Sequence, residues 1–189
     1  YSLDDVTGDL TLRNGKAHAT LQSKNPLIGG NLNLTASMHK RRVKATVEGT
    51  FAQLDFHGLH LTEKPFSASA RTMLELETDL KDYYSVRGTI NELVINDNNQ
   101  IYHPDNFTLN VLTRSDTTQA VVNCGDFRMR LNGRGGYQKL LAQSQKFANE
   151  IESLVKNRTI DQLALRKKLP WASLYLQSGK DNFFCYLLA

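Results

Sequence analysis

Cysteine is scarce in this sequence, and long apolar runs are missing from it. Only Cys124 and Cys185 occur among the 189 residues, which is too few for a disulfide framework or a cysteine-based metal site. We expect two buried free thiols, and cysteine usage does not identify the compartment. No stretch approaches the roughly 18 apolar residues of a membrane-spanning helix, and no signal peptide is present.

The two ends of the sequence indicate that it is a fragment of a longer protein. It begins at Tyr1 without a methionine and stops within the apolar run 183–189. Missing targeting or membrane segments therefore prove little about the whole protein.

The charge is mildly basic, with a formal net charge of +4 and an isoelectric point near 9.1. Much of it lies in two clusters, 39–44 and 166–168. We interpret these first as solvated charges at turns and helix ends, and second as a surface that attracts anionic lipid head groups. Because no aromatic-basic RNA-binding motif accompanies them, we expect no nucleic acid partner.

Four glycines open similar stretches of sequence. Gly8, Gly49, Gly88 and Gly125 are separated by 41, 39 and 37 residues, which indicates a degenerate repeat of about forty residues. Such repeats are usually stacked units that cannot bury their apolar faces alone. Function then belongs to an extended surface more readily than to a catalytic pocket.

Between about residues 8 and 132, apolar and polar residues alternate with a period of two. Examples are Leu32/Leu34/Ala36/Met38 and Phe107/Leu109/Val111. This pattern is typical of strands that are buried on one face and wet on the other. Asn14-Gly15 predicts a type I′ hairpin turn, and the short connections predict antiparallel three-strand meanders.

After Gly133–Gly136 the apolar period changes to that of a helix. One stripe of an amphipathic helix contains Leu140, Leu141, Phe147, Ile151 and Leu154, and we expect this face to pack on the sheet. A second short helix is expected from Thr159 to Leu169, before Pro170. The expected division is 1–133 for the sheet, 134–170 for the helical segment, and 171–189, where a further strand at Ala172–Gln177 stays open.

The expected sheet is too wide for these helices to cover. About ten strands at about 4.8 Å give a width near 45 Å, whereas a helix about 10 Å thick covers two strands. Either the sheet curls on itself, or something outside the fragment, such as acyl chains, covers the remainder. We predict that the apolar groove is lined by residues that are each also candidates for ordinary core: Leu54, Phe56, Leu74, Ile90, Leu93, Phe107, Leu109, Phe127 and Met129.

Motifs for catalysis or metal binding are weak. If His57 and His60 lie in a strand, their spacing puts them on opposite faces. Ser37-x-x-Lys40 matches a serine acylase string, but it lies at a strand end entering a basic turn and not at a helix start. Gly133-x-Gly-Gly136 is better interpreted as a hinge from sheet to helix than as a phosphate loop.

The remaining acids do not form an expected catalytic pair. Asp4, Asp5, Asp79, Asp82 and Asp97 lie in predicted turns, where carboxylates accept local backbone hydrogen bonds. We therefore expect no enzyme, no cofactor and no metal.

Several segments together resemble the TamB branch of the AsmA-like family. They are residues 51–62, 101–104, 112–118, 125–127 and 135–143, and the resemblance covers about residues 8–145. It implies an elongated, curled antiparallel β-sheet with an apolar inner groove, in a periplasmic protein anchored to the inner membrane outside this fragment. The helical stretch 137–169 departs from a plain run of such repeats.

Three functions follow as hypotheses. The first, implied by the resemblance, is a non-enzymatic envelope segment that aids outer-membrane biogenesis, by protein translocation and assembly or by phospholipid transport along the groove. The second is a chaperone-like scaffold that binds outer-membrane protein strands by edge pairing. The third is a structural spacer whose helix plugs the sheet.

Overall fold

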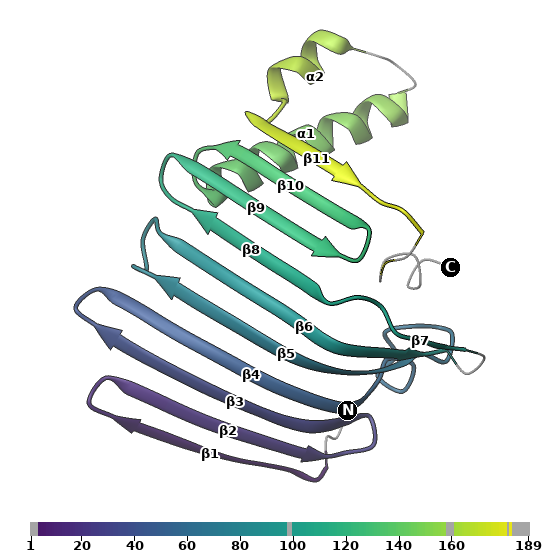
Figure 1. Cartoon of the computed structure of the whole chain (residues 1–189). Helices are drawn as coiled ribbons and strands as arrows, with labels where there is room; N and C mark the ends of the chain where they lie inside the picture. Colours follow the sequence, from purple (N-terminus) through teal and green to yellow (C-terminus); the bar gives the residue numbers. More distant parts are fainter. Residues whose placement is uncertain (1–3, 98–99, 158–160, 181, 183–189) are drawn as a thin grey trace.

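A computed structural model of the chain (Figure 1) describes residues 4–97, 100–157, 161–180 and 182. Within these residues the chain forms one antiparallel sheet of eleven strands that is not closed into a barrel, with two helices towards its C-terminal end. The predicted mainly β, antiparallel fold is confirmed. The elements are β1 Val6–Arg13, β2 Lys16–Lys24, β3 Ile28–His39, β4 Arg42–Asp55, β5 Ser67–Thr78, β6 Tyr84–Asn96, β7 Ile101–Tyr102, β8 Phe107–Thr113, β9 Thr117–Cys124, β10 Phe127–Arg134, α1 Tyr137–Asn157, α2 Gln162–Lys168 and β11 Ala172–Gln177.

The sheet is a continuous meander in which each strand lies beside the next one along the chain. The order is β1-β2-β3-β4-β5-β6-β8-β9-β10-β11, and the two-residue β7 pairs with the end of β6. Asn14 and Gly15 have φ values of 50° and 71°, as the predicted type I′ turn requires. β11 spans the segment that the sequence left open as a further strand, and it pairs with β10.

The four repeat glycines occupy different places in the meander. Gly8 and Gly49 lie in the same row across the sheet, because Gly8 pairs with Leu21, Leu21 with Leu32, and Leu32 with Gly49. Gly88 lies two strands further on, in β6, and is displaced by two residues along the strand from the position that aligns with Gly49. Gly125 is in the turn between β9 and β10, with φ 57°. The forty-residue period thus spans three strands in one repeat and two longer strands in the next.

A band of irregular pairing crosses β3, β4, β5 and β6 near one end of these strands. The register shifts at Gly29/Gly30, between Phe51 and Leu54, and between Ser69 and Arg71. Bulges bend a strand and increase its twist, and Figure 1 shows these strands curving at that end. Beyond the bulges lies the buried cluster of Ala68, Ala70, Leu93 and Ile95, against which Phe56, Phe66, Ile90 and Tyr102 pack.

The junction between β10 and α1 is held by hydrogen bonds to the β8–β9 hairpin. The Gly135 N–H donates to the Asp116 carbonyl (2.6 Å), and the Gly136 N–H donates to the Ser115 carbonyl (3.1 Å). The hydroxyl of Thr113 accepts the Tyr137 N–H (3.0 Å). Gly135 has φ 106°, which favours glycine. These contacts support the interpretation of 133–136 as a hinge from sheet to helix.

A substitution at Gly30 tests how closely β3 and β4 approach each other at the band of bulges. A Cβ on Gly30 would lie 2.3 Å from the Thr50 carbonyl oxygen and 2.9 Å from the Phe51 Cα, so backbone would have to move. We expect Gly30→Ala to lower the free energy of unfolding by about 3 kcal/mol, measured by urea denaturation. Gly88→Ala is the control, because its Cβ would meet its nearest atom at 3.4 Å; we expect a change within about 1 kcal/mol. Equal effects of the two substitutions would contradict this packing.

Candidate functional site

One face of the sheet carries three rows of apolar side chains that run across the strands in register. We call these rows, together, the apolar trough. The first row is Leu12, Ala17, Ala36, Ala45, Leu76, Val86, Val111, Ala120, Leu131 and Leu174. The second row is Leu10, Ala19, Leu34, Val47, Leu74, Gly88, Leu109, Val122, Met129 and Leu176. The third row, from β1 to β10, is Gly8, Leu21, Leu32, Gly49, Thr72, Ile90, Phe107, Cys124 and Phe127.

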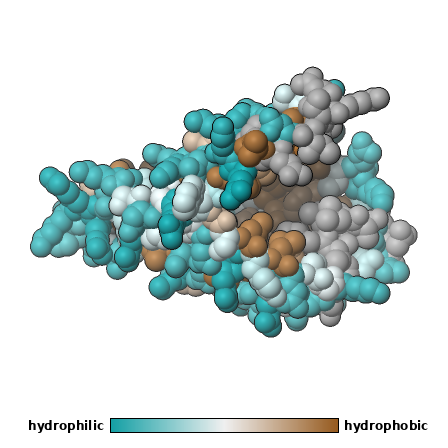
Figure 2. All heavy atoms as spheres, turned by 90° about the horizontal axis from the view of Figure 1, so that it is seen from above, coloured by the Kyte–Doolittle hydropathy of each residue, from teal (hydrophilic) through white to brown (hydrophobic). Residues whose placement is uncertain are grey.

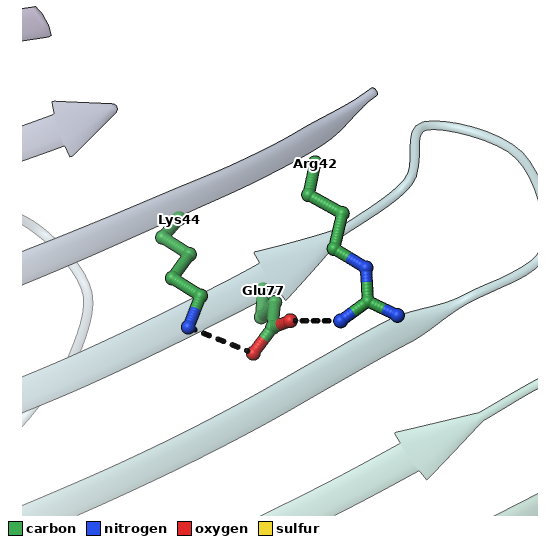
Figure 3. A network of polar contacts seen from close by, with 3 residues as sticks. All are labelled: Arg42, Lys44 and Glu77. Carbon is green, nitrogen blue, oxygen red and sulfur yellow. Dashed lines mark hydrogen bonds and ion pairs between the residues drawn. The ribbon is translucent and has the colours of Figure 1, made fainter. Parts of the chain in front are cut away.

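The opposite face of the sheet is mostly polar. One of its rows reads Arg13, Lys16, Ser37, Lys44, Glu77, Ser85, Leu112, Gln119, Asn132 and Ser173. On this face the Glu77 carboxylate forms ion pairs with the Arg42 guanidinium at 3.0 Å and with the Lys44 ammonium at 3.6 Å (Figure 3). Arg42 and Arg114 also lie over the Tyr83 ring. Ion pairs and cation–π contacts thus connect neighbouring strands and turns on the side away from the trough.

The apolar trough is exposed to solvent mainly on its outermost strands. Leu10 and Leu12 on β1 are 65% and 70% exposed, and Leu174 and Leu176 on β11 are also exposed. Leu34, Val47, Leu109 and Met129 in the interior strands are half-buried, mainly by their neighbours in the sheet. Figure 2 shows hydrophobic side chains gathered inside a hollow of the molecule. Contiguous exposed apolar patches on proteins commonly coincide with surfaces that contact other molecules.

Helix α1 covers only the C-terminal part of the trough, along the margin formed by the ends of β8 and β10. Leu140 is buried against Gly133 of β10, where a Cβ would meet a Leu140 methyl group at 2.4 Å. The Tyr137 ring packs edge-on against the Tyr84 ring at 5.3 Å between centroids, and burial, followed by the neighbouring Tyr137, raises the pKa of Tyr84. Figure 1 shows α1 at this end of the sheet, far from β1 to β4.

The predicted helix face divides into covered and exposed residues. Leu140 is buried, and Phe147 and Leu154 are half-buried. Leu141 and Ile151, by contrast, are exposed large apolar residues. The covered stripe therefore follows Leu140, Phe147 and Leu154, at spacings of seven residues.

The predicted groove residues fall into two groups. Leu74, Phe107, Leu109, Phe127 and Met129 lie in the rows of the apolar trough. The others lie at the bulged end: Leu93 belongs to the buried cluster, Phe56 and Ile90 pack against it, and Leu54 pairs with Ala68 beside it. Ile90 belongs to both groups, because it is also the β6 member of the third row.

Many trough residues were not among the predicted lining residues. They include the large apolar side chains of the outer strands, Leu10, Leu12, Leu21, Leu32, Leu34, Leu174 and Leu176, and also Val47, Leu76, Val86, Val111, Val122 and Leu131 of the interior strands. Their period-two spacing is visible in the sequence. What the sequence does not show is that they stand in register with one another, which depends on pairing between distant segments.

The residues considered for chemistry lie apart from the trough. His57 and His60 are in the turn after β4 and not in a strand, which corrects the sequence interpretation; the Nδ1 atoms of their rings lie 3.2 Å from the Thr62 and Gly58 carbonyls, respectively. Among the described residues, no group of three or more His, Cys, Asp or Glu is placed to hold a metal ion. Cys124 is buried on the trough face, where its Sγ–H donates to the Asp105 carbonyl at 3.6 Å, and Cys185 lies outside the described residues.

The acids in the turns hold the backbone of those turns. Asp79 accepts the N–H groups of Lys81, Asp82 and Tyr83 at 2.9, 3.1 and 2.9 Å. The hydrogen bond from Tyr83, followed by that from Lys81, lowers the pKa of Asp79. Asp97 accepts the Gln100 N–H at 2.7 Å. These carboxylates have a local structural use, as predicted for turn acids.

No family model, curated protein or solved structure matches the chain. Within the part of the chain that the structure describes, neither helix combines the length and the apolar character needed to cross a bilayer.

Proposed function

We propose that this chain is a non-enzymatic segment of a cell-envelope protein, and that its apolar trough binds the acyl chains of phospholipids. The observation that carries the proposal is the register of the three rows. Each row joins β1 to the C-terminal strands, whereas polar residues occupy most of the opposite face. At about 4.8 Å per strand, ten strands form a strip about 43 Å long.

The trough fits an extended, flexible apolar ligand better than a compact one. Its rows are long, and they contain small residues such as Ala17, Ala36, Ala45 and Gly49 between the leucines. Burying about 200 Å² of apolar surface supplies about 5 kcal/mol, which corresponds to a dissociation constant between micromolar and millimolar. Binding of that strength holds an acyl chain and still allows it to slide along the strip.

The cellular setting rests on the sequence resemblance to the TamB branch of the AsmA-like family. On that basis we propose a periplasmic segment of a protein that is anchored to the inner membrane by a region outside these residues. Its role there is outer-membrane biogenesis, by phospholipid transport or by assembly of outer-membrane proteins. Exposed leucines on both outermost strands support a surface that continues beyond the strands described here.

The free edge of β1 favours a second candidate function, the binding of an unfolded outer-membrane strand by edge pairing. Every residue of β1 is exposed. β1 pairs with β2 along one edge, and no described strand pairs with its other edge. The Lys24 N–H donates to the Asp5 carbonyl (3.0 Å), so the alternation of an antiparallel ladder leaves the backbone groups of Gly8 and Leu10 pointing away from β2. An added strand would pair with these groups.

The acyl-chain proposal is tested by two adjacent residues on opposite faces of β5. Leu74 lies in the trough and Met73 on the polar face, and they are 40% and 39% exposed. We expect Leu74→Asp to weaken binding of a short-chain phosphatidylcholine at least about tenfold, because an acyl chain that covers this position would remove water from the new carboxylate. Met73→Asp is the matched control and should leave binding unchanged.

Binding is measured by native mass spectrometry and calorimetry on delipidated protein, below the critical micelle concentration. Circular dichroism of each variant shows whether the sheet is retained. If folded Leu74→Asp binds as tightly as the unsubstituted chain, or if Met73→Asp weakens binding equally, the trough is not the binding surface.

Two substitutions at Leu10 distinguish peptide binding by backbone edge pairing from peptide binding through the leucine side chain. Leu10→Pro removes an outward N–H without removing a β1–β2 hydrogen bond, and Leu10→Ala removes the side chain but keeps the N–H. If peptides from outer-membrane strands bind by edge pairing, the proline variant should bind at least about fivefold more weakly than the alanine variant in fluorescence anisotropy. Equal binding by the two variants would eliminate the edge-pairing function.

A further inference from the structure

The two ends of the strands form margins of opposite charge on either side of the trough. Because the sheet is a meander, alternate turns lie at the same margin. One margin consists of the turns 13–16, 39–42, 79–83 and 114–116 and the junction 134–136. These segments hold eight lysines and arginines against three aspartates, and we call them the basic margin; Figure 1 shows it on the left.

The opposite margin is acidic. It consists of residues 4–5, 24–27, 55–66, 97, 100–106, 125–126 and 178–180. The residues of this margin that the structure describes include seven aspartates and glutamates against three lysines. A ligand that lies in the trough therefore meets positive charge at one margin and negative charge at the other.

The positive charge is least compensated beside β1 to β4. Arg13, Lys16, Lys40 and Arg41 are exposed, and none of the four forms an ion pair with another described residue. The turns that hold them, 13–16 and 39–42, contain no acidic residue. We call these four side chains the basic corner.

The basic corner adjoins exposed apolar side chains of the sheet. Arg13 directly follows Leu12, which is 70% exposed, and Lys40 is two residues after Met38, which is also exposed. Lys16 directly precedes Ala17 in the first row. In the strand register Arg13 and Lys16 belong to the polar face, but they lie at the strand ends, where a long cationic side chain can extend to the margin beside Leu12. A cation and an apolar surface thus meet at the same corner.

We infer that the trough selects anionic phospholipids, with the acyl chains on the apolar rows and the phosphate-bearing head group at the basic corner. This inference rests on the proposed function and adds the class of head group. A free phosphate would use the cations but leave Leu12 and Met38 exposed to water. A zwitterionic lipid would use the apolar rows, but the positive part of its head group would face the four cations.

The test compares two lipids that share their acyl chains and differ in head group. Short-chain phosphatidylglycerol and phosphatidylcholine are titrated below their critical micelle concentrations into the full chain, at low and at moderate salt. Salt screens the attraction between a cation and an anionic head group. We expect phosphatidylglycerol to bind at least about fivefold more tightly at low salt, with a smaller preference at moderate salt.

The decisive variant combines Arg13→Gln, Lys16→Gln, Lys40→Asn and Arg41→Gln. Asparagine is used at position 40 because Lys40 has φ 55°, which asparagine tolerates. The matched control combines Arg87→Gln, Arg128→Gln, Arg130→Gln and Lys146→Gln, which changes the net charge equally at places outside the basic corner. The corner variant should lose the preference, to within about twofold, and keep phosphatidylcholine binding; the control should keep the preference.

Each other result has a defined meaning. Equal binding of both lipids to the unsubstituted chain overturns the head-group inference and leaves the acyl-chain proposal standing. Absence of binding by either lipid removes both. Displacement of phosphatidylglycerol by equimolar inorganic phosphate, or by a short single-stranded RNA, would show an anion site that does not need the lipid and would overturn the inference.

Discussion

Hydrogen bonding between neighbouring strands fixes which side chains share a face, because side chains alternate with a period of two. In this sheet every regular strand pair keeps the leucine-rich positions aligned, from Leu12 on β1 to Leu174 on β11. A shift of one residue in any pair would send the apolar residues of the following strands to the polar face. The trough therefore depends on the register of the whole meander and not on any single residue.

Two regions of the sheet are covered, each by a different segment of the chain. At the bulged end, the extra residues bend β4 to β6 so that Leu93 and Ile95 become buried against the segment that carries Phe56 and Phe66. At the C-terminal end, Leu140 of α1 fits against Gly133, where a side chain would leave no room. Between these two covered regions the strands have no second layer within the described residues, and that is where an acyl chain would lie.

Local patterns were sufficient to predict the strands, the antiparallel arrangement and the hairpin at Asn14-Gly15. They were also sufficient for the hinge at Gly135, because a helical period begins immediately after it. They were not sufficient for the bulges, since Ala70 and Leu93 join one buried cluster only through pairing of distant segments. The period-two pattern also predicts a strand through His57, but the chain turns there and brings Phe56 against Phe66.

The central claim is that acyl chains lie on one face of this sheet. The most direct measurement is photocrosslinking with a phospholipid that carries a diazirine near the end of an acyl chain, followed by peptide mapping. The account predicts adducts on trough residues of several strands, such as Leu34, Val47 and Leu109, and none on polar-face positions such as Thr46 and Asn110. Adducts spread equally over both faces, or confined to the helices, would contradict it.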